Sequence, residues 1–370
     1  MAYSGGAVVD RHNTLDIEAG PEDPIVASFT STGRGECLAL SLDRGRTFTD
    51  FPGNPVLRHT GRDPKVIWYE PSQKWVLIVY EELADQRGYA LYDSHDLQRW
   101  TRLVFLPGFY ECPELFELAV DGDPERKKWI IYGSTWQQYL SAYLIGDFDG
   151  ATFTPAGEPL SAHCGPHFYA AQTFSHVPDG RVIMLGWLRL GWQPGDEFPG
   201  MPFGHGMTIP LELSLCSTPQ GLRLCFLPVQ ELQNLHTGTI AAQNLTIPQA
   251  NRLLAEVRDE LLDIQVTIQP HSPQPFQIDL RGHPILYHPA QNEISFAGKT
   301  ASLLPILDSF ELRLLIDRSV TEVFADQGYA AFSAMTIFPE DSLPITLQGD
   351  VTIQSLTIHP LRSIWHDEGS

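Results

Sequence analysis

The sequence predicts an all-β fold, a β-propeller followed by a C-terminal β-sandwich. A segment made of a strand, a turn and an aromatic residue recurs about every 50 residues, and a hairpin precedes each of its later copies. From about residue 262, short segments alternate strictly between apolar and polar residues, as half-buried strands do. We therefore expect a propeller domain over 1–236, a linker over 237–260 and a sandwich domain over 261–370.

The repeated segments read CLALSLDRGRTFTDF, YALYDSHDLQRWTRL and AYLIGDFDGATFTPA. Each ends in an aromatic residue followed by threonine: Phe48, Trp100 and Phe153. The hairpins before the last two copies carry Trp75 and Trp129. A period of this length, built from several short strands, is typical of a propeller blade. With a third hairpin, FYAAQTFSHVPDGRVIMLGW, the chain contains four such units, although a plain all-β sandwich is an alternative.

The heads of the equivalent strands are Ser4, Asp63, Glu111 and roughly His167. In a propeller the first strand of each blade lines the central channel, so equivalent positions meet at one mouth. Two carboxylates that meet in a polar cleft can cleave a glycosidic bond, one as proton donor and the other by stabilising positive charge. Taken singly, each acid also has a structural interpretation. Asp63 is a turn aspartate before proline, and Glu111 is a solvated residue at a strand edge.

The second half of the sequence offers strands without catalytic features. LLDIQVTIQ, FQIDLRG, NEISFAG and VTIQSLTIHPL alternate with turns at the spacing of an antiparallel sandwich. We expect Asp317-Arg318-Ser319 in a hairpin and Glu322 on its strand, and a helix only around 249–259.

Composition narrows the classes of partner. The chain has 370 residues and a net charge of −21, which disfavours nucleic acid and anionic membranes and is compatible with neutral sugars. No apolar run approaches the roughly 20 residues that span a bilayer, and the first residues lack the pattern of a signal peptide. Five cysteines, an odd number in a long chain, do not indicate a disulfide scaffold. The cellular location is not predicted.

Several motifs resemble one family. GRDPKV, ECPELFEL, GDFDG, the FYAAQTF hairpin, FPGMPFGHGMTIPLELSL and LLIDRSVTEVFADQG occur in the order seen in glycoside hydrolase family 32. That family contains the β-fructofuranosidases, namely invertases, levanases and exo-inulinases. The resemblance implies a five-bladed propeller followed by a sandwich, action on β-fructosides, and no cofactor or metal.

The resemblance also implies roles for individual residues. Glu111 would be the acid/base, and Asp63 would stabilise the transition state. Contacts with the fructose ring would come from Arg62, Tyr3, Ser4, Trp187 and His167.

The sequence departs from the family at the nucleophile. The family uses an aspartate in an Asn-Asp-Pro element of the first blade, and no Asn-Asp-Pro occurs here; the sequence begins where the second blade is expected. Asp10 lies six residues along the strand from Ser4, or about 20 Å. Asp196 and Glu197 are local candidates, but an exposed acidic loop is the plainer interpretation. Direct attack by water, or a carboxylate from a neighbouring chain, would also complete the chemistry.

Two further hypotheses follow from these departures. His163, Cys164 and His167 suggest zinc ligands, but a fourth ligand is missing at a plausible spacing, so we predict no metal. Four blade units would leave open strand edges. The four units could close on themselves, another chain could cover the edges, as in an isologous dimer, or this chain could be a shortened form of a five-bladed parent.

The predicted function is hydrolysis of β-fructosides of the sucrose, inulin or levan type. The main alternative is a propeller that binds fructosides without turning them over. An arabinofuranosidase-like enzyme fits the motifs less well, because it does not combine RDPKV with ECPELFEL.

Overall fold

The structure is a computed structural model that describes residues 1–365 except 19, 136–140, 191–203, 304–308 and 339–343. Contacts within the chain divide it into two compact units. The first unit comprises Met1–Ala162 with Ala170–Val182, and the second comprises His163–Tyr169 with Ile183–Ser370. This division does not fall at residue 236. In the described part of the chain, no helix is long and apolar enough to span a membrane.

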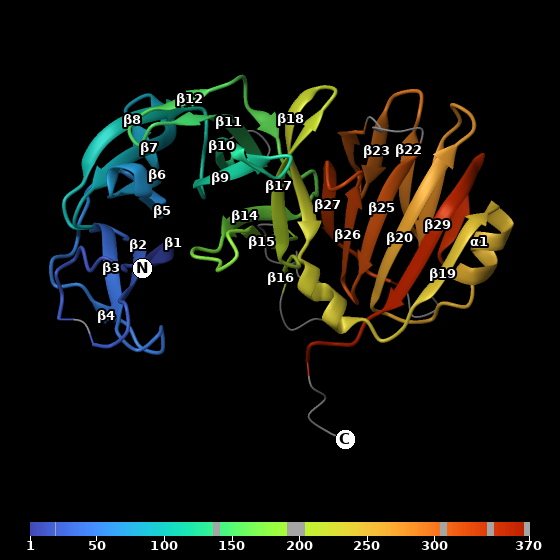
Figure 1. The fold of residues 1–370 in the computed structure, drawn as a ribbon, viewed down its shortest axis with the longest axis horizontal. Helices are drawn as coiled ribbons and strands as arrows, with labels where there is room; N and C mark the ends of the chain where they lie inside the picture. The colour runs from blue at the N-terminus through green and yellow to red at the C-terminus, as the bar shows by residue number, and fades with distance from the viewer. Residues whose placement is uncertain (19, 136–140, 191–203, 304–308, 339–343, 366–370) are drawn as a thin grey trace. The chain divides into compact units, whose positions relative to one another are not determined.

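The first unit opens with a four-stranded antiparallel sheet. Its strands follow one another in order: β1 (Ala2–Val9), β2 (Ile25–Ser31), β3 (Gly35–Ser41) and β4 (Thr49–Asp50). The aromatic Phe48 of the first sequence repeat lies just before β4. This sheet is the first repeat unit, and Figure 1 shows it in blue.

The second sheet has the same order and the same antiparallel pairing. It consists of β5 (Gly61–Tyr69), β6 (Lys74–Leu83), β7 (Gln86–Ser94) and β8 (Thr101–Pro107), with a 3₁₀ turn, Glu70–Ser72, between the first two strands. Trp75, one of the two repeated tryptophans, lies in β6 and is buried.

The third repeat again places four strands in sequence order. These are β9 (Glu114–Val120), β10 (Asp123–Ser134), β11 (Ser141–Phe148) and β12 (Phe153–Pro155), and the short β13 (Leu160–Ser161) also pairs with β11. Trp129 lies in β10, the position equivalent to that of Trp75 in β6. The repeat that the sequence predicted is therefore a repeat of four antiparallel strands that follow one another in sequence order.

The remaining propeller strands begin with β14 (Phe168–Thr173), which runs from the second unit into the first. The next strand, β15 (Val182–Arg189), pairs with β16 (His205–Met207). The hairpin of β17 (Leu211–Thr218) and β18 (Gly221–Pro228) turns at Pro219 and Gln220. A 3₁₀ helix, Gln230–Leu235, follows it.

The sandwich consists of two antiparallel sheets, as predicted. One sheet has six strands in the order β19-β29-β20-β25-β26-β27, and the other has five in the order β24-β23-β22-β21-β28. The strands of the six-stranded sheet are β19 (Ile240–Leu245), β20 (Leu262–Pro270), β25 (Phe310–Ile316), β26 (Val320–Ala325), β27 (Ala330–Met335) and β29 (Val351–Pro360). Those of the five-stranded sheet are β21 (Phe276–Leu280), β22 (His283–His288), β23 (Glu293–Phe296), β24 (Lys299–Ser302) and β28 (Thr346–Gln348).

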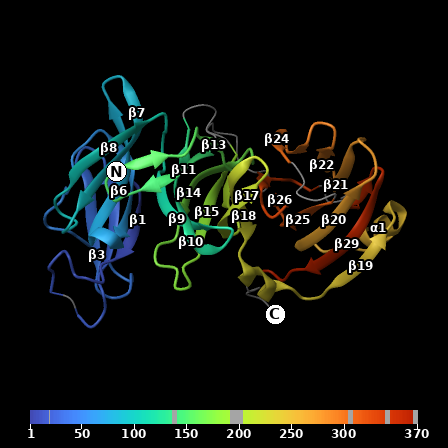
Figure 2. The same ribbon diagram turned by 45° about the horizontal axis from the view of Figure 1, so that its top comes forward.

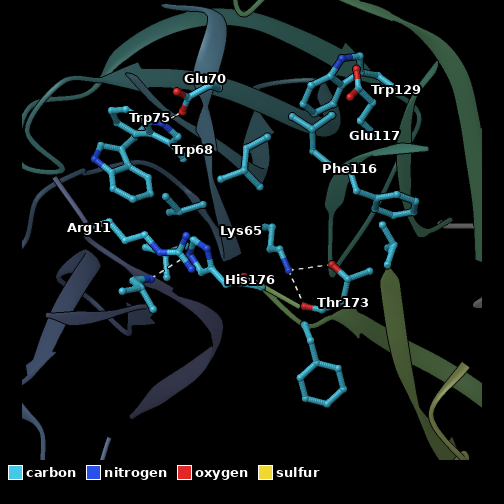
Figure 3. Close-up of a pocket in the computed structure, with 18 of the residues that line it drawn as sticks. Arg11, Lys65, Trp68, Glu70, Trp75, Phe116, Glu117, Trp129, Thr173 and His176 are labelled. Carbon is cyan, nitrogen blue, oxygen red and sulfur yellow. Dashed lines mark hydrogen bonds between the residues drawn. The ribbon is translucent and has the colours of Figure 1, made fainter. Parts of the chain in front are cut away.

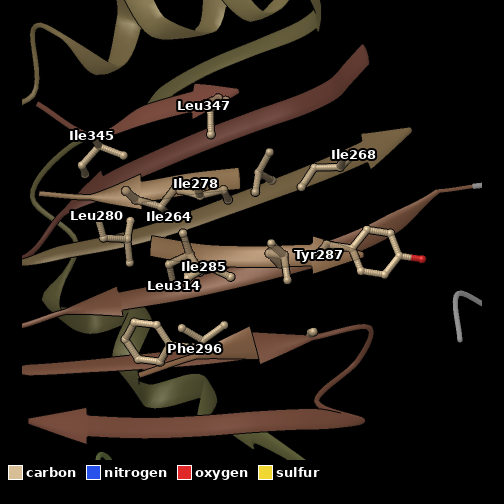
Figure 4. Close-up of a cluster of buried hydrophobic side chains, with 14 of the residues drawn as sticks. Ile264, Ile268, Ile278, Leu280, Ile285, Tyr287, Phe296, Leu314, Ile345 and Leu347 are labelled. Carbon is tan, nitrogen blue, oxygen red and sulfur yellow. The ribbon is translucent and has the colours of Figure 1, made fainter. Parts of the chain in front are cut away.

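A single apolar core fills the space between these two sheets. Figure 4 shows side chains of β20 and β25, such as Ile264 and Leu314, among those of β21, β22 and β23, such as Ile278, Ile285 and Phe296. All five are at most 2% exposed. The alternation seen in the sequence thus reflects one buried face on each strand.

The segment 237–260, expected to be a linker, contributes regular structure to the sandwich instead. β19 pairs with β29, Gln243 opposite Ser355, and the helix α1 (Ile247–Leu254) lies against both strands (Figures 1 and 2). Thr246 and Gln249 form a capping box at its start, and Ala250 and Leu254 are buried in the sandwich core. The helix expected around 249–259 therefore begins and ends earlier.

A short loop, His163–His167, covers the edge strand β27. The Cys164 N–H donates to the Ala331 carbonyl at 2.8 Å, and His167 Nδ1 accepts the Met335 N–H at 2.9 Å. Gly165 lies so close that a Cβ atom there would be 2.4 Å from the backbone N and O of Ser333. The loop thereby protects a strand edge that would otherwise be open to pairing.

Behind this loop lies a buried polar chain that includes a carboxyl group. The His163 ring and Ser333 Oγ are 3.1 Å apart, and His163 Nδ1 accepts the Gly165 N–H, so the other ring nitrogen carries the proton toward Ser333. Ser333 hydrogen-bonds to Glu322, and Glu322 Oε1 also accepts the Ile209 N–H. Because His163 donates its ring proton to Ser333, it cannot act as a base toward this serine. The hydrogen-bonded series from His163 to Glu322 therefore has a structural role.

Burial controls the protonation of both titratable groups in this chain. It lowers the pKa of His163 to about 3, which keeps the ring neutral. It raises the pKa of Glu322 to about 8, from an ordinary value of 4.5. Because the folded chain binds the Glu322 proton more tightly than the unfolded chain, this proton stabilises the fold fully below about pH 4.5. That stabilisation is lost as the pH rises through about 8.

We predict that Glu322→Gln removes this pH dependence. Relative to the wild type, the variant should gain about 4 kcal/mol of unfolding free energy between pH 5 and pH 8.5, because an amide needs no proton to remain neutral. Denaturant unfolding at a series of pH values measures the difference. Glu260→Gln, in an exposed ion pair with Arg318, is the matched control and should show no such trend. A constant difference between Glu322→Gln and the wild type across this range would contradict the prediction.

Candidate active site

The head of β5 carries Arg62 and Asp63 on an irregular stretch of strand. The pairing of β5 with β6 shifts register between Arg62 and Lys65, and Asp63 has a φ of 65°. Successive side chains of a regular strand point to opposite faces, whereas a bulge re-aims one of them. Adjacent residues can therefore both point toward the head of β9.

The Asp63 carboxylate is buried, 4% exposed, and is held by two neighbouring blades. Ser4 Oγ of β1 donates to Oδ1 at 3.1 Å. The Cys112 N–H, just before β9, donates to Oδ2 at 3.2 Å, and the thiol lies 3.7 Å from the same oxygen. Ser4, Asp63 and the residue that follows Glu111 therefore meet here, whereas the place of the fourth predicted strand head, His167, stays a prediction.

Glu111 is joined to Asp63 by the guanidinium of Arg62. Arg62 Nε donates to Glu111 Oε1 at 3.1 Å, Nη2 donates to the same oxygen, and Asp63 Oδ2 lies 3.9 Å from Nε. Nη2 also donates to the Tyr110 hydroxyl at 3.0 Å. Both carboxylates thus lie within reach of one cation.

Aromatic rings surround this guanidinium. Its central carbon lies 5.7, 5.2 and 5.5 Å from the ring centroids of Tyr3, Tyr80 and Tyr110. Tyr80 is fully buried, but Tyr3 is 47% exposed. The site therefore has a closed side and a side where an aromatic face meets solvent, an arrangement suited to stacking on a sugar ring.

The backbone of Asp63 is fixed by a side chain of the first blade. The Asp63 N–H donates to Thr30 Oγ1 at 3.1 Å, and the Thr30 hydroxyl donates to Glu36 at 2.9 Å. His59 Nε2 lies 2.7 Å from the same Glu36 oxygen. Because the threonine hydrogen is committed to Glu36, its lone pair is available to accept the Asp63 N–H.

Electrostatics differ among the groups of the site. Burial raises the pKa of Asp63, although the Cys112 amide, Arg62 and Ser4 oppose the rise. Burial alone would lower the pKa of Arg62, but its bond to Glu111 and the charges of both acids outweigh this and raise it. Burial, followed by the charge of Asp63, raises the pKa of the Cys112 thiol, so that it stays neutral.

His167 and Trp187 belong to the second unit, where both have partners. His167 Nδ1 accepts the Met335 amide of β27, as described above. Trp187 lies in β15, tilted against Tyr169 at 6.3 Å, edge-on to His205 at 5.1 Å and under Arg189. Their predicted contacts with a sugar remain predictions.

The other acidic candidates fall into two groups. Asp10 is fully buried, and its carboxylate accepts hydrogen bonds from the Thr14 amide and hydroxyl and from the Leu15 amide, so it stabilises a turn. Asp196 and Glu197 lie outside the described residues. Within the described ranges, no group of three His, Cys, Asp or Glu side chains is placed to hold a metal ion.

Sequence reasoning missed Tyr80, Thr30 and Glu36. The register of two hairpins would have identified these residues. Arg62 is paired with Tyr80 across the β5–β6 hairpin, and Thr30 with Glu36 across the β2–β3 hairpin. Counting residues back from the turn of each hairpin would place these pairs to within one residue. The Cys112 amide left no signal, because any non-proline residue supplies an N–H.

Comparisons with known proteins agree with the motifs, the repeats and this geometry. Residues 1–228 match the N-terminal domain of glycosyl hydrolases family 32, and residues 231–360 match the C-terminal domain of the same family. The chain belongs to glycosyl hydrolase family 32.

Relatives of this family-32 chain include bacterial and fungal enzymes. It is 34% identical to a levanase of Bacillus subtilis over 98% of its own length, and it covers 60% of that levanase. It is 26% identical to an extracellular exo-inulinase of Aspergillus niger over 99% of its length, covering 82% of the relative. The chain thus spans less than two thirds of the levanase.

The solved structures establish the fold of this family member. The crystal structure of an exo-inulinase from Aspergillus awamori matches with a TM-score of 0.84 at 24% identity, covering 99% of this chain and 84% of that one. A β-fructofuranosidase from Schwanniomyces occidentalis matches with a TM-score of 0.81 at 22% identity, covering 98% and 83%. The predicted class, a β-propeller followed by a β-sandwich, is confirmed.

We predict that Thr30→Val destabilises the fold through Asp63. Valine has the shape of threonine but leaves the Asp63 N–H and buried Glu36 without this partner, so the free energy of unfolding should fall by about 1–3 kcal/mol. Denaturant unfolding measures the change. The control, Thr49→Val, replaces an exposed threonine of the same sheet and should change stability by less than about 0.5 kcal/mol. Equal stability of Thr30→Val and the wild type would show that Thr30 does not support Asp63.

Proposed function

We propose that this chain hydrolyses β-fructosides of the sucrose, inulin or levan type and releases fructose. The observation that carries the proposal is the set of Asp63, Arg62 and Glu111, in which one guanidinium lies close to a buried carboxylate and to a partly exposed one. Family membership supports the reaction class. The names of the levanase and exo-inulinase relatives support the substrate class.

Glu111 is the proposed proton donor. It transfers its proton to the glycosidic oxygen as the bond from that oxygen to the anomeric carbon of fructose breaks, and the leaving alcohol departs neutral. Its side chain is 17% exposed, which leaves it accessible from the solvent side. Arg62, with Tyr110 beside it, holds Glu111 in place.

Asp63 is the proposed stabiliser of the positive charge that develops at the anomeric carbon. A carboxylate in a buried site interacts more strongly with such a charge than one in water. Its fixed donors, Ser4 and the Cys112 amide, orient it before the substrate arrives. Arg62, Tyr3 and Ser4 are the proposed sugar contacts beside the two acids, and the sugar contacts expected from the family resemblance for Trp187 and His167 stay predictions.

Two groups are proposed to attack the anomeric carbon: a water molecule, or a carboxylate of a second copy of this chain. The family resemblance implies an aspartate, and this sequence contains no Asn-Asp-Pro element. Attack by water, which gives fructose and an alcohol, balances the reaction without a covalent intermediate. Attack by a carboxylate of a second copy would form a fructosyl ester, which water then hydrolyses to release fructose and the free carboxylate. Measuring the mass of the active species shows whether the second copy is needed.

We expect fructose to be released from sucrose, inulin or levan, and to be released more slowly by variants of either acid. Glu111→Gln should reduce kcat by roughly 10²–10⁴-fold, because it removes the proton donor. Asp63→Asn should reduce it by roughly 10²–10³-fold, because it removes the stabilising charge. With fructosyl fluoride, whose leaving group needs no proton, Glu111→Gln should reduce kcat much less than with sucrose. Liquid chromatography of the released fructose measures each rate.

Asp147→Asn, in an exposed ion pair with Lys128, is the matched control and should behave as the wild type. Release by the wild type that does not exceed release by the Asp63→Asn/Glu111→Gln double variant would overturn the proposal. Binding of fructose in calorimetry without turnover would instead favour the fructoside-binding alternative.

Ser4→Ala should shift the pH profile in a defined direction. Asp63 must be ionised to stabilise positive charge, so kcat/KM rises with pH through the raised pKa of Asp63. The Ser4 hydroxyl holds that pKa down, and its loss moves the acid limb of the profile to higher pH. Initial rates on sucrose from pH 3 to 8 measure the limb. An unmoved limb, or a shift to lower pH, would assign it to another group.

A further inference from the structure

Asp63 lies in β5 and Glu111 lies just before β9, and these two strands belong to different sheets. β5 pairs with β6, and β9 pairs with β10. Backbone hydrogen bonds fix each strand within its own blade but do not fix the distance between the two acids. That distance depends on side chains that reach from one blade to the next.

Three such links connect β5 to the head of β9 at successive levels. Arg62 contacts Glu111, and Asp63 accepts the Cys112 amide. The third link joins Lys65 to Glu114, with Nζ 3.0 Å from Oε2. The acids themselves make the first two links, whereas the third lies two residues beyond Asp63 and three beyond Glu111.

The third link also includes β14. Lys65 Nζ donates to the Thr173 carbonyl at 2.7 Å and to its Oγ1 at 2.9 Å, as the dashed lines in Figure 3 show. The Thr173 hydroxyl donates in turn to Glu114 Oε2. The Lys65 side chain therefore links three strands: β5, which carries it, and β9 and β14, which its ammonium group contacts.

This cluster is costly to bury. The side chains of Lys65 and Glu114 are 6% and 0% exposed, and Glu114 Oε1 has no hydrogen-bond partner among the described residues. Apolar residues of similar volume often replace a buried ion pair at no loss of stability. Stability alone therefore does not explain why charges occupy this place directly behind the acids.

We propose that Lys65, Glu114 and Thr173 form a positioning clamp that sets the spacing of Asp63 and Glu111. The proposal rests on the roles proposed above for these two acids. A misplacement of about 1 Å in a reacting group can cost 10²-fold in rate. Removing the clamp should therefore lower kcat while sugar binding changes little.

The test removes both charges at once. Lys65→Met/Glu114→Leu fills similar volume and leaves no unpaired charge, so it should fold with a Tm near that of the wild type. Its kcat on sucrose should fall by roughly 10²-fold, with KM within a few-fold. The control, Lys74→Met/Asp93→Leu, removes a 2.7 Å ion pair between β6 and β7 of one sheet and should leave kcat unchanged.

A cavity beside Lys65 permits chemical rescue. It has a volume of about 390 Å³ and is lined by Lys65 and Thr173 and by the exposed residues Arg11 and His12, so small solutes can reach the clamp (Figure 3). Lys65→Ala removes the equivalent of propylammonium. Added propylammonium chloride should restore a large part of kcat, with saturation, and propanol should not, because it carries no charge.

One readout does not require activity. Hydrogen exchange of the peptide that contains the Cys112 amide should be faster in Lys65→Met/Glu114→Leu than in the wild type, because the Asp63–Cys112 contact loosens. In the Lys74/Asp93 control it should be unchanged. If the wild type releases no fructose but this difference appears, the proposed function fails and the clamp stands.

Two outcomes would overturn the clamp. One is unchanged kcat in a well-folded Lys65→Met/Glu114→Leu variant of an active wild type. The other is unchanged exchange at Cys112. Equal rescue by propylammonium and propanol would also reject it, since that would make Lys65 a filler of volume.

Discussion

The site depends on a local departure from strand geometry at Asp63. Arg62 and Asp63 are neighbours in sequence, and in a regular strand their side chains would point to opposite faces. The bulge and the positive φ of Asp63 let both reach the head of β9, where Glu111 and the Cys112 amide meet them. Thr30 holds this conformation from the neighbouring blade. Without that irregularity, one cation could not serve both carboxylates.

The sequence predicted the parts of the molecule that repeat. Aromatic residues at regular intervals and alternating strands indicate a propeller and a sandwich, and the equivalence of the repeats predicts that Ser4, Asp63 and Glu111 lie close together. It could not predict partners set by long-range register. The segment taken for a linker forms β19, whose partner β29 lies more than a hundred residues later, so no local pattern identifies it. Short strands such as β28 are likewise defined by their neighbours.

Three buried acids illustrate three ways to offset desolvation. Asp63 keeps fixed donors from two blades and a nearby guanidinium. Glu114 pairs with an ammonium, although one of its oxygens has no partner in the described part of the chain. Glu322 is kept protonated, since its pKa of about 8 leaves it mostly neutral at pH 7. Asp63 and Glu114 lie at the inner strands of the propeller, where a charged carboxylate has a proposed role in the reaction. Glu322 lies in the sandwich, where a neutral carboxyl group is enough to complete the hydrogen bonds.

The close fit of Gly165 against Ser333 bears on how this chain can be divided. The loop from His163 to His167 lies within the family's N-terminal module, yet its amide and imidazole groups complete the edge of β27 in the C-terminal module. A fragment that begins at residue 231 would expose the edge of β27 to other copies of the fragment. A fragment that ends at residue 228 would lack the strand against which the loop packs. Recombinant halves would therefore aggregate or misfold for a reason unrelated to the acids, and chimaeras between family members would need to exchange the loop together with the strand it covers.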